Sequence, residues 1–135
     1  MPIRKARRGD LPRVRKLAES LGLDSPGMES DTFWVAEDKG RIEGICGLKS
    51  HPECLELYAL GVKERERGRG TGGDLVRTLI REVKGDIYLA TIIPGFFERL
   101  GFSRTTEFPP FIVRGGEWCE GCDRALCTVM MRRAE

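Results

Sequence analysis

A glycine-rich segment is the part of the sequence whose residue types and spacing point most directly to chemistry. It runs Arg67-Gly-Arg-Gly-Thr-Gly-Gly73 and comes just before an apolar pattern of helical spacing between Leu75 and Val83. Glycines let the backbone approach an anion and turn its N–H groups toward it. A helix N-terminus adds unpaired donors and partial positive charge, and Arg65, Arg67 and Arg69 add charge-assisted contacts. The segment therefore predicts a phosphate site rather than a flexible turn, and a pyrophosphate is the ligand that it suits best.

Two other kinds of glycine-rich phosphate site do not fit this sequence. The P-loop ends in Gly-Lys-Ser or Gly-Lys-Thr, and neither tripeptide occurs in the chain. The letters of the dinucleotide fingerprint are met by Gly68, Gly70 and Gly73, but the pattern before them predicts a hairpin rather than the first strand of a βαβ unit. We therefore expect neither a P-loop nor a Rossmann site.

The elements that must position this segment alternate between strand and helix patterns. Strand patterns cover residues 2–6, 32–37, 41–48, 54–62, 86–91, 102–108 and 125–132. One helix is expected to follow Asp10 and stop at Gly22, a second to follow the glycines and end at Gly85, and a short one to cover 96–100. This order predicts an α/β fold with a mixed sheet, formed by residues 1–135 as a single domain.

Composition excludes several classes of protein. The chain has 135 residues, of which 40% are hydrophobic and 33% charged, which suits one core and is too charged for a membrane protein. The net charge of +2 implies no general affinity for nucleic acid. The basic N-terminal residues are not followed by the apolar segment of a secretory signal. We expect a cytoplasmic protein with no membrane partner.

Two motifs resemble the signatures of the GNAT superfamily of N-acetyltransferases. The stretch Arg67-Gly-Arg-Gly-Thr-Gly72 resembles the motif R/Q-x-x-G-x-G/A, and Phe96-Phe-Glu-Arg-Leu-Gly-Phe102 resembles the second signature, an aromatic residue, three further residues and then Gly-Phe. Leu60-Gly-Val62 is similar to the strand end whose backbone pairs with the pantetheine arm of the cofactor. The resemblance covers most of the chain and is closest over residues 32–102.

The resemblance implies a GNAT fold, with a mixed and mostly antiparallel sheet flanked by helices, and acetyl-CoA as co-substrate without a metal. The residues that it implies for cofactor binding are Leu60, Gly61, Val62, Arg67, Gly68, Arg69, Gly70, Thr71, Gly72, Gly73 and Phe97. Stretches such as Ile42-Glu-Gly-Ile-Cys-Gly-Leu48 are also similar to amino-acid acetyltransferases of the acetylglutamate-synthase kind and to small arsenic-resistance acetyltransferases. This subgroup implies acetyl transfer to the primary amine of a small molecule, with an amino acid favoured. A homodimer is a further expectation.

Candidate catalytic residues lie on the strand that leads into the glycine-rich segment. Glu56 is the candidate base that takes the proton of the amine, because a glutamate on this strand often has that role in the superfamily. Phe97 occupies the position where the superfamily usually has a tyrosine acid, so Tyr58 is the candidate substitute, with a packed core tyrosine as the alternative. His51, the only histidine, stands beside Pro52 in a predicted turn, and we favour a turn residue over a catalytic one.

Three cysteines near the C-terminal end leave alternatives open. Cys119, Cys122 and Cys127 offer thiolates for a metal, but a structural zinc site needs a fourth ligand. We favour no metal and expect this segment to shape the acceptor side of the site. Two other functions remain: a regulatory or sensing module that binds acetyl-CoA with little turnover, and a protein N-terminal acetyltransferase.

Overall fold

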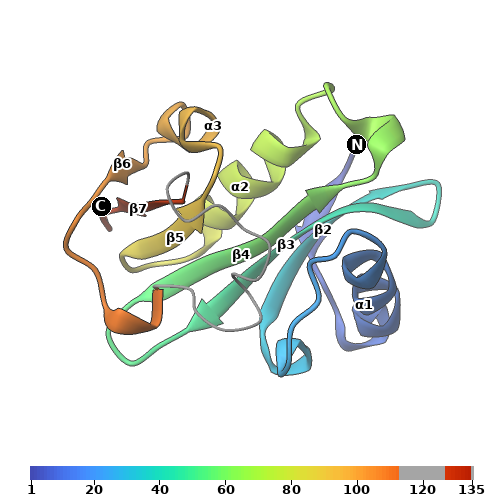
Figure 1. The fold of residues 1–135 in the computed structure, drawn as a ribbon. Coiled ribbons are helices and arrows are strands. Elements are labelled where there is room, and N and C mark those ends of the chain that lie inside the picture. The colour runs from blue at the N-terminus through green and yellow to red at the C-terminus, as the bar shows by residue number, and fades with distance from the viewer. Residues whose placement is uncertain (113–126, 135) are drawn as a thin grey trace. The chain divides into compact units, whose positions relative to one another are not determined.

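The computed structural model describes residues 1–112 and 127–134. The contacts divide the chain into two compact units, one formed by residues 1–50 and 57–83 and the other by residues 51–56 and 84–135. Strand β4 (Leu55–Val62) contributes its first two residues to the second unit and the rest to the first. Figure 1 labels the helices and strands in chain order.

The first unit contains strands β1 (Ile3–Lys5), β2 (Thr32–Asp38) and β3 (Arg41–Ser50) and most of β4, in that order across the sheet. β1 pairs with β2, and β2 with β3, in antiparallel fashion. The turn between β2 and β3 places Lys39 and Gly40 at φ values of 51° and 78°, in the left-handed region that tight hairpins require. The strands predicted at 32–37 and 41–48 thus form an antiparallel hairpin.

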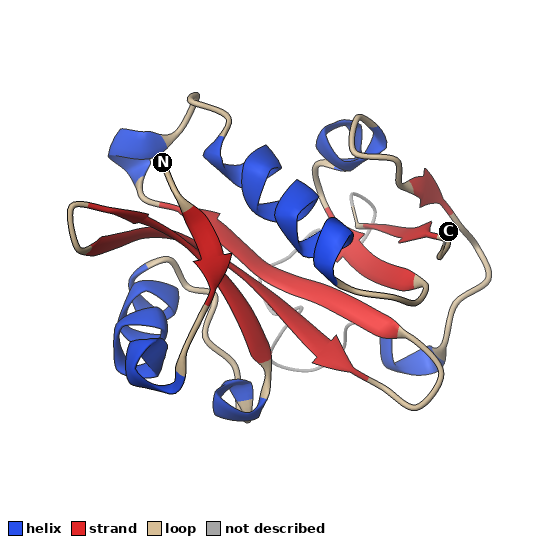
Figure 2. Ribbon diagram, turned by 180° about the vertical axis from the view of Figure 1, so that it is seen from behind, coloured by secondary structure: helices blue, strands red, loops and turns tan. Residues whose placement is uncertain are grey.

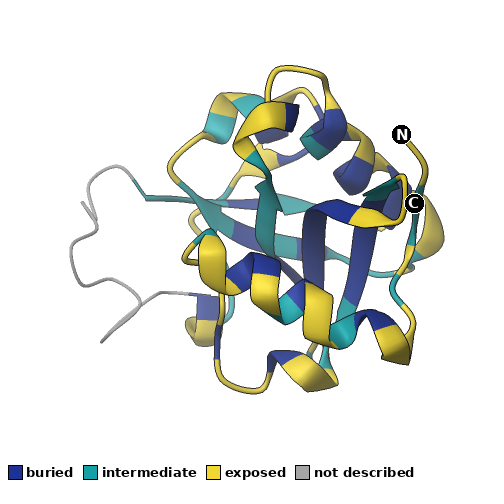
Figure 3. Ribbon diagram, turned by 90° about the vertical axis from the view of Figure 1, so that its right-hand side faces the viewer, coloured by how far each residue is buried: buried dark blue, intermediate teal, exposed yellow. Residues whose placement is uncertain are grey.

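Two helices cover opposite faces of this part of the sheet (Figure 2). Helix α1 (Leu11–Ser20) packs the apolar residues Val14, Leu17 and Ala18 against a cluster from β2 and β3. Helix α2 (Thr71–Glu82) buries Leu75, Val76 and Leu79. Around α1, buried residues alternate with exposed ones, as expected for an amphipathic surface helix (Figure 3).

Strand β4 is irregular at its centre. Ala59 has a φ of 52°, in the left-handed region that residues other than glycine rarely adopt. In a regular strand Leu55, Leu57 and Ala59 would share one face and Glu56, Tyr58 and Leu60 the other, and this alternation is interrupted at Ala59. A side chain in this conformation costs of order 1 kcal/mol.

The second unit contains the start of β4 together with β5 (Ile87–Thr91), α3 (Pro94–Glu98), β6 (Ser103–Arg104) and β7 (Thr128–Arg132), with the strands in the order β4-β5-β7-β6. The parallel ladder of β4 and β5 joins Leu55 to Ile87 and Glu56 to Tyr88. β7 pairs antiparallel with both β5 and β6. The predicted mixed, mostly antiparallel sheet flanked by helices is confirmed.

Two local predictions were wrong. Strand β6 covers two residues rather than 102–108, because the chain turns at Thr105, whose hydroxyl accepts from the Glu107 N–H and donates to the Glu107 carbonyl oxygen. Asp10 precedes α1 as expected but makes no side-chain cap to it. Its carboxylate instead accepts hydrogen bonds from Arg4, Arg13 and the backbone N–H of Arg7.

Candidate functional site

The glycine-rich segment forms the start of α2, as the sequence predicts. Gly68 and Gly70 have φ values of +83° and +80°, and a side chain at either position would meet no atom within 4 Å. The first bond of the helix runs from the Asp74 N–H to the Gly70 carbonyl oxygen at 3.0 Å. The N–H groups of Thr71, Gly72 and Gly73 precede it and have no acceptor within the helix. These donors and the open space beside the two glycines fit a diphosphate.

Two arginines flank these donors. Arg67 donates from Nε to the Val62 carbonyl oxygen at 3.2 Å, which ties it to the end of β4. Arg69 lies 3.5 Å from a Glu66 carboxylate oxygen, with 70% of its side chain exposed. Arg67 and Gly70 are also exposed, so both charge and backbone are accessible at this end of α2.

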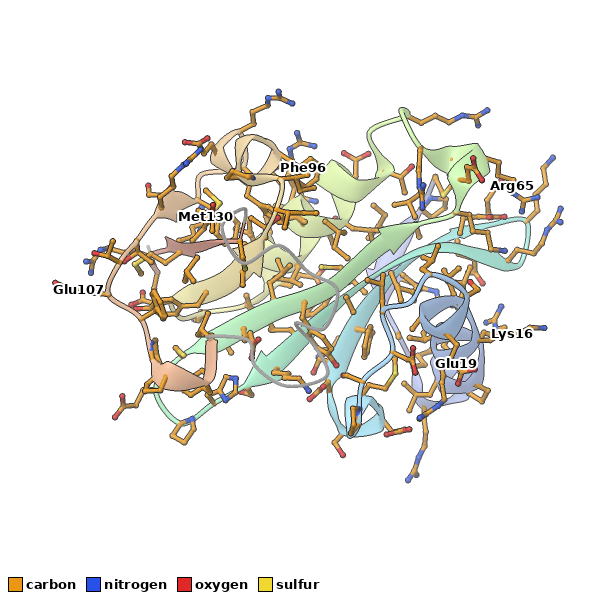
Figure 4. The ribbon with its side chains drawn as sticks, viewed as in Figure 1. Lys16, Glu19, Arg65, Phe96, Glu107 and Met130 are labelled. Carbon is orange, nitrogen blue, oxygen red and sulfur yellow. The ribbon has the colours of Figure 1, made fainter. Side chains whose placement is uncertain are left out.

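Arg65, the third arginine expected at the phosphate, has a different partner. It donates from Nη2 and Nε to the carboxylate of Glu43 on β3, and the Lys63 ammonium lies 3.6 Å from the same carboxylate. Figure 4 shows Arg65 on the segment between β4 and α2. The Glu43 side chain is only 2% exposed. The charge of Arg65 is therefore largely used to neutralise a buried carboxylate.

Opposing effects act on the pKa of Glu43. Burial raises the pKa, but the hydrogen bond from Arg65 and the charges of Lys63, Arg65 and Arg41 lower it by more, so the net shift is downward. The backbone carbonyl of Glu43 also accepts from the Lys63 N–H at 2.8 Å. Glu43 thus fastens the segment that leads into the glycines to the neighbouring strand β3.

The remaining residues expected at the cofactor have clear places in the fold. Leu60, Gly61 and Val62 are half-buried at the end of β4. A Cβ at Gly61 would lie 2.5 Å from Leu23 Cδ1 and 2.7 Å from Leu21 Cδ1, so a larger residue there would displace these two side chains. Phe97 is buried on α3 and packs edge to face with Phe96 and Phe102, at ring-centroid distances of 4.9 and 5.6 Å.

The candidate acid Tyr58 belongs to a polar cluster in the first unit. Its hydroxyl donates to Oδ2 of Asp31, which also accepts from the Lys49 ammonium at 2.8 Å. The same ammonium lies 4.5 Å from the centroid of the Tyr58 ring. Tyr58 itself is buried. The hydroxyl proton is therefore held by a carboxylate that carries a second, cationic partner.

The candidate base Glu56 is paired with His51. His51 Nε2 lies 3.0 Å from Glu56 Oε1, and the two side chains are 22% and 5% exposed. The imidazole also stacks on Phe111, with ring centroids 3.9 Å apart and an interplanar angle of 23°. All three residues belong to the second unit.

Three of these partners were not identified from the sequence. His51 was assigned to a turn, and neither Glu43 nor Asp31 was singled out. One signal was present for Glu43, because a lone carboxylate in the apolar run Ile42-Glu-Gly-Ile-Cys46 is buried only when it is paired. No pattern relates His51 to Glu56, since the turn between them determines whether their side chains meet.

Of the cysteine segment, Cys119 and Cys122 lie outside the described residues. Cys127 is half-buried and in no disulfide. Among residues 1–112 and 127–134, no group of three or more His, Cys, Asp or Glu side chains is arranged to hold a metal ion. No helix in this part of the chain is long and apolar enough to cross a membrane.

Comparison with known proteins identifies sequence relatives of one kind. The family model for an acetyltransferase (GNAT) domain matches residues 29–104. An uncharacterised N-acetyltransferase of Chlorobaculum tepidum is 26% identical over 92% of this chain and 88% of its own length. N-acetyltransferase 8 of Rattus norvegicus is 31% identical, over 56% of this chain and 40% of its own length.

Solved structures show the same fold. A Mycobacterium tuberculosis protein in complex with CoA matches with a TM-score of 0.73 and 20% identity over the full length of both chains. N-acetylglutamate synthase of Neisseria gonorrhoeae, complexed with coenzyme A and N-acetyl-glutamate, matches with a TM-score of 0.73 and 21% identity. This second match covers 99% of the present chain and 35% of the synthase. At these identities the likeness establishes the fold alone.

Proposed function

Since this chain belongs to the GNAT family and is an acetyl-CoA-dependent N-acetyltransferase, we propose that its acceptor is the primary amine of a small molecule, and specifically of an amino acid. The acceptor class is supported by the stretches that resemble amino-acid acetyltransferases. It is also supported by a structural neighbour that was solved with N-acetyl-glutamate.

The observation that carries the cofactor part of the proposal is the glycine-rich start of α2. Its free N–H groups, the left-handed Gly68 and Gly70 and the exposed Arg67 and Arg69 form a donor set suited to the diphosphate of acetyl-CoA. We assign the half-buried end of β4, Leu60 to Val62, to the pantetheine arm. Phe97 is assigned to the cofactor by its place in the second signature.

The chemistry that we propose is direct transfer. The amine nitrogen attacks the thioester carbonyl, the C–N bond forms and the C–S bond breaks, with acetyl-amine and CoA as products. Glu56 takes the proton that the amine must lose. Tyr58 supplies a proton to the departing sulfur, for which its hydrogen bond to Asp31 has to be exchanged. A thiolate leaves with little assistance near neutral pH, so we expect the base to matter more than the acid.

An acceptor screen tests this function. Purified protein with acetyl-CoA should release free thiol in the presence of one or more amino acids, and faster than with polyamines or with a peptide that has a free N-terminus. Preference for the peptide would replace our proposal with a protein N-terminal acetyltransferase. CoA binding without release for any amine would favour the sensing module. The predictions of a cytoplasmic location, of a homodimer and of a single domain over residues 1–135 stay predictions.

A further inference from the structure

The pairing of His51 with Glu56 has no place in the chemistry outlined above. Glu56 lies at the start of β4, where it pairs in register with Tyr88 of β5, and its carboxylate is almost fully buried. His51 lies in the turn before β4, where its backbone N–H donates to the Cys54 carbonyl oxygen at 2.9 Å. The turn thus brings the only imidazole of the chain to 3.0 Å from the proposed base.

We propose that His51 is the positioning residue for Glu56, an inference that rests on the proposed role of Glu56 as base. An ionised carboxylate only accepts hydrogen bonds, so the imidazole nitrogen that faces it must carry the proton. His51 therefore donates Nε2–H to Oε1. This contact holds Oε1 and so fixes the rotation of the carboxylate that receives the amine proton.

Phe111 supports this arrangement from one side of the imidazole. The ring stacks nearly parallel on the imidazole, so the ring plane of His51 is held from one side while its backbone is held by Cys54. Phe111 belongs to the 3₁₀ turn Pro110–Ile112, which packs against β5, the strand that also pairs with Glu56. The donor and the acceptor are thus fastened to the same strand, and this limits the movement of the carboxylate.

The protons balance without transfer to the imidazole. The amine proton passes to the Glu56 carboxylate, and the Nε2–H stays on His51 throughout. His51 therefore acts through Glu56 and needs no contact with the acceptor or with acetyl-CoA.

A double-mutant cycle separates positioning from a structural role. The variants are His51→Leu, His51→Gln, Glu56→Gln and His51→Leu combined with Glu56→Gln, assayed by thiol release. The amide N–H of glutamine can take the place of Nε2–H, so His51→Gln should recover most of the activity that His51→Leu loses. We expect His51→Leu to lower kcat by about 10- to 100-fold, as misplacement of a catalytic group does, while the KM for acetyl-CoA stays within about twofold.

The decisive result is the behaviour of the double variant. If His51 acts through Glu56, adding His51→Leu to Glu56→Gln should lower kcat no further. Additive losses, or equal losses for His51→Leu and His51→Gln, would overturn the proposal. Glu53→Gln, at an exposed position in the same turn, is the matched control and should leave kcat unchanged.

Failure of this inference can be told apart from failure of the proposed function. If Glu56→Gln keeps wild-type kcat, the base assignment is wrong and the positioning role fails with it. If Glu56→Gln loses activity but His51→Leu does not, Glu56 stands and His51 is a turn residue. Thermal unfolding of every variant identifies a loss that arises from unfolding: a His51→Leu defect that follows the folded fraction refutes positioning.

Discussion

The start of α2 allows a sharp test of cofactor binding through substitution of Gly70 by aspartate or by asparagine. Gly70 is the residue before the helix, with a φ of +80°, and a side chain there would point into space free of other atoms within 4 Å. Aspartate and asparagine have nearly the same shape, and both adopt the left-handed conformation more readily than most residues. The pair therefore differs at the place assigned to the diphosphate in charge and in the amide N–H donors of asparagine, but hardly in shape.

The expected magnitude follows from charge repulsion. Two unit charges about 5 Å apart repel by about 0.8 kcal/mol in bulk water and about 3 kcal/mol at the effective dielectric constant near a protein surface. A diphosphate carries more than one charge, so Gly70→Asp should weaken CoA binding by at least about 1.4 kcal/mol, which is tenfold. The fold should survive, because a Cβ at Gly70 would meet no atom within 4 Å and the left-handed conformation costs an aspartate of order 1 kcal/mol.

Calorimetric titration with CoA measures this difference directly. Gly70→Asn should bind CoA within a fewfold of wild type, and Gly70→Asp should bind at least tenfold more weakly than Gly70→Asn. The gap should narrow at high salt, because ions screen exposed charges. Equal affinities for the two variants at low salt would show that no phosphate lies near Gly70. The assignment of the glycine-rich segment to the diphosphate would then be wrong.

Three further predictions follow from the buried carboxylates. Glu56→Gln should lower kcat about 100-fold and regain part of it at high pH, where more of the amine is already neutral; wild-type rates at every pH would refute the base role. Glu43→Gln should raise the KM for acetyl-CoA with little change in kcat, since it loosens the segment before the glycines, whereas the exposed Glu64→Gln should change neither. Hydrogen bonds from Arg4 and the Arg7 N–H hold the pKa of Asp10 well below its usual range, so its contribution to stability is complete above about pH 4 and is lost on further acidification. Asp10→Asn should therefore be less stable than wild type by about 1–3 kcal/mol at pH 7, and urea unfolding should show this difference shrinking as the pH falls below 4.

The elements that the sequence predicted well are those with a local cause. Helix α2 begins at Thr71, within the glycine-rich segment and just ahead of the apolar spacing, and the β2–β3 hairpin follows from Asp38-Lys39-Gly40. The strand expected at 102–108 failed because its apolar alternation was weak and a side-chain turn at Thr105 took over. The spacing of apolar residues depends only on which residues are apolar. It therefore gives no sign of a turn that is closed by a side-chain hydroxyl.

The residues of the candidate site were predictable only where one continuous segment of the chain contains them. The donors at the start of α2 lie within a few consecutive residues, so their grouping could be derived from the sequence. The pairing of Arg65 with Glu43 joins residues 22 positions apart, and that of Tyr58 with Asp31 joins residues 27 apart. Which cation neutralises which carboxylate depends on strand order and register. Sequence reasoning consequently assigned Arg65 to a phosphate, while the structure gives it to Glu43.

Strand β4 carries the residues that we assign to proton transfer and those that we assign to the cofactor, and its irregular residue lies between the two sets. Glu56 and Tyr58 precede Ala59, and Leu60 to Val62 follow it and lead into the glycine-rich segment. A left-handed alanine persists only where its surroundings compensate for the strain, and Ala59 packs against the same apolar cluster as Tyr58. The strand thus gives up regular alternation between the residues that we assign to proton transfer and those that we assign to the cofactor. A uniform strand would impose one alternation on both sets, whereas the break at Ala59 lets each set be oriented independently.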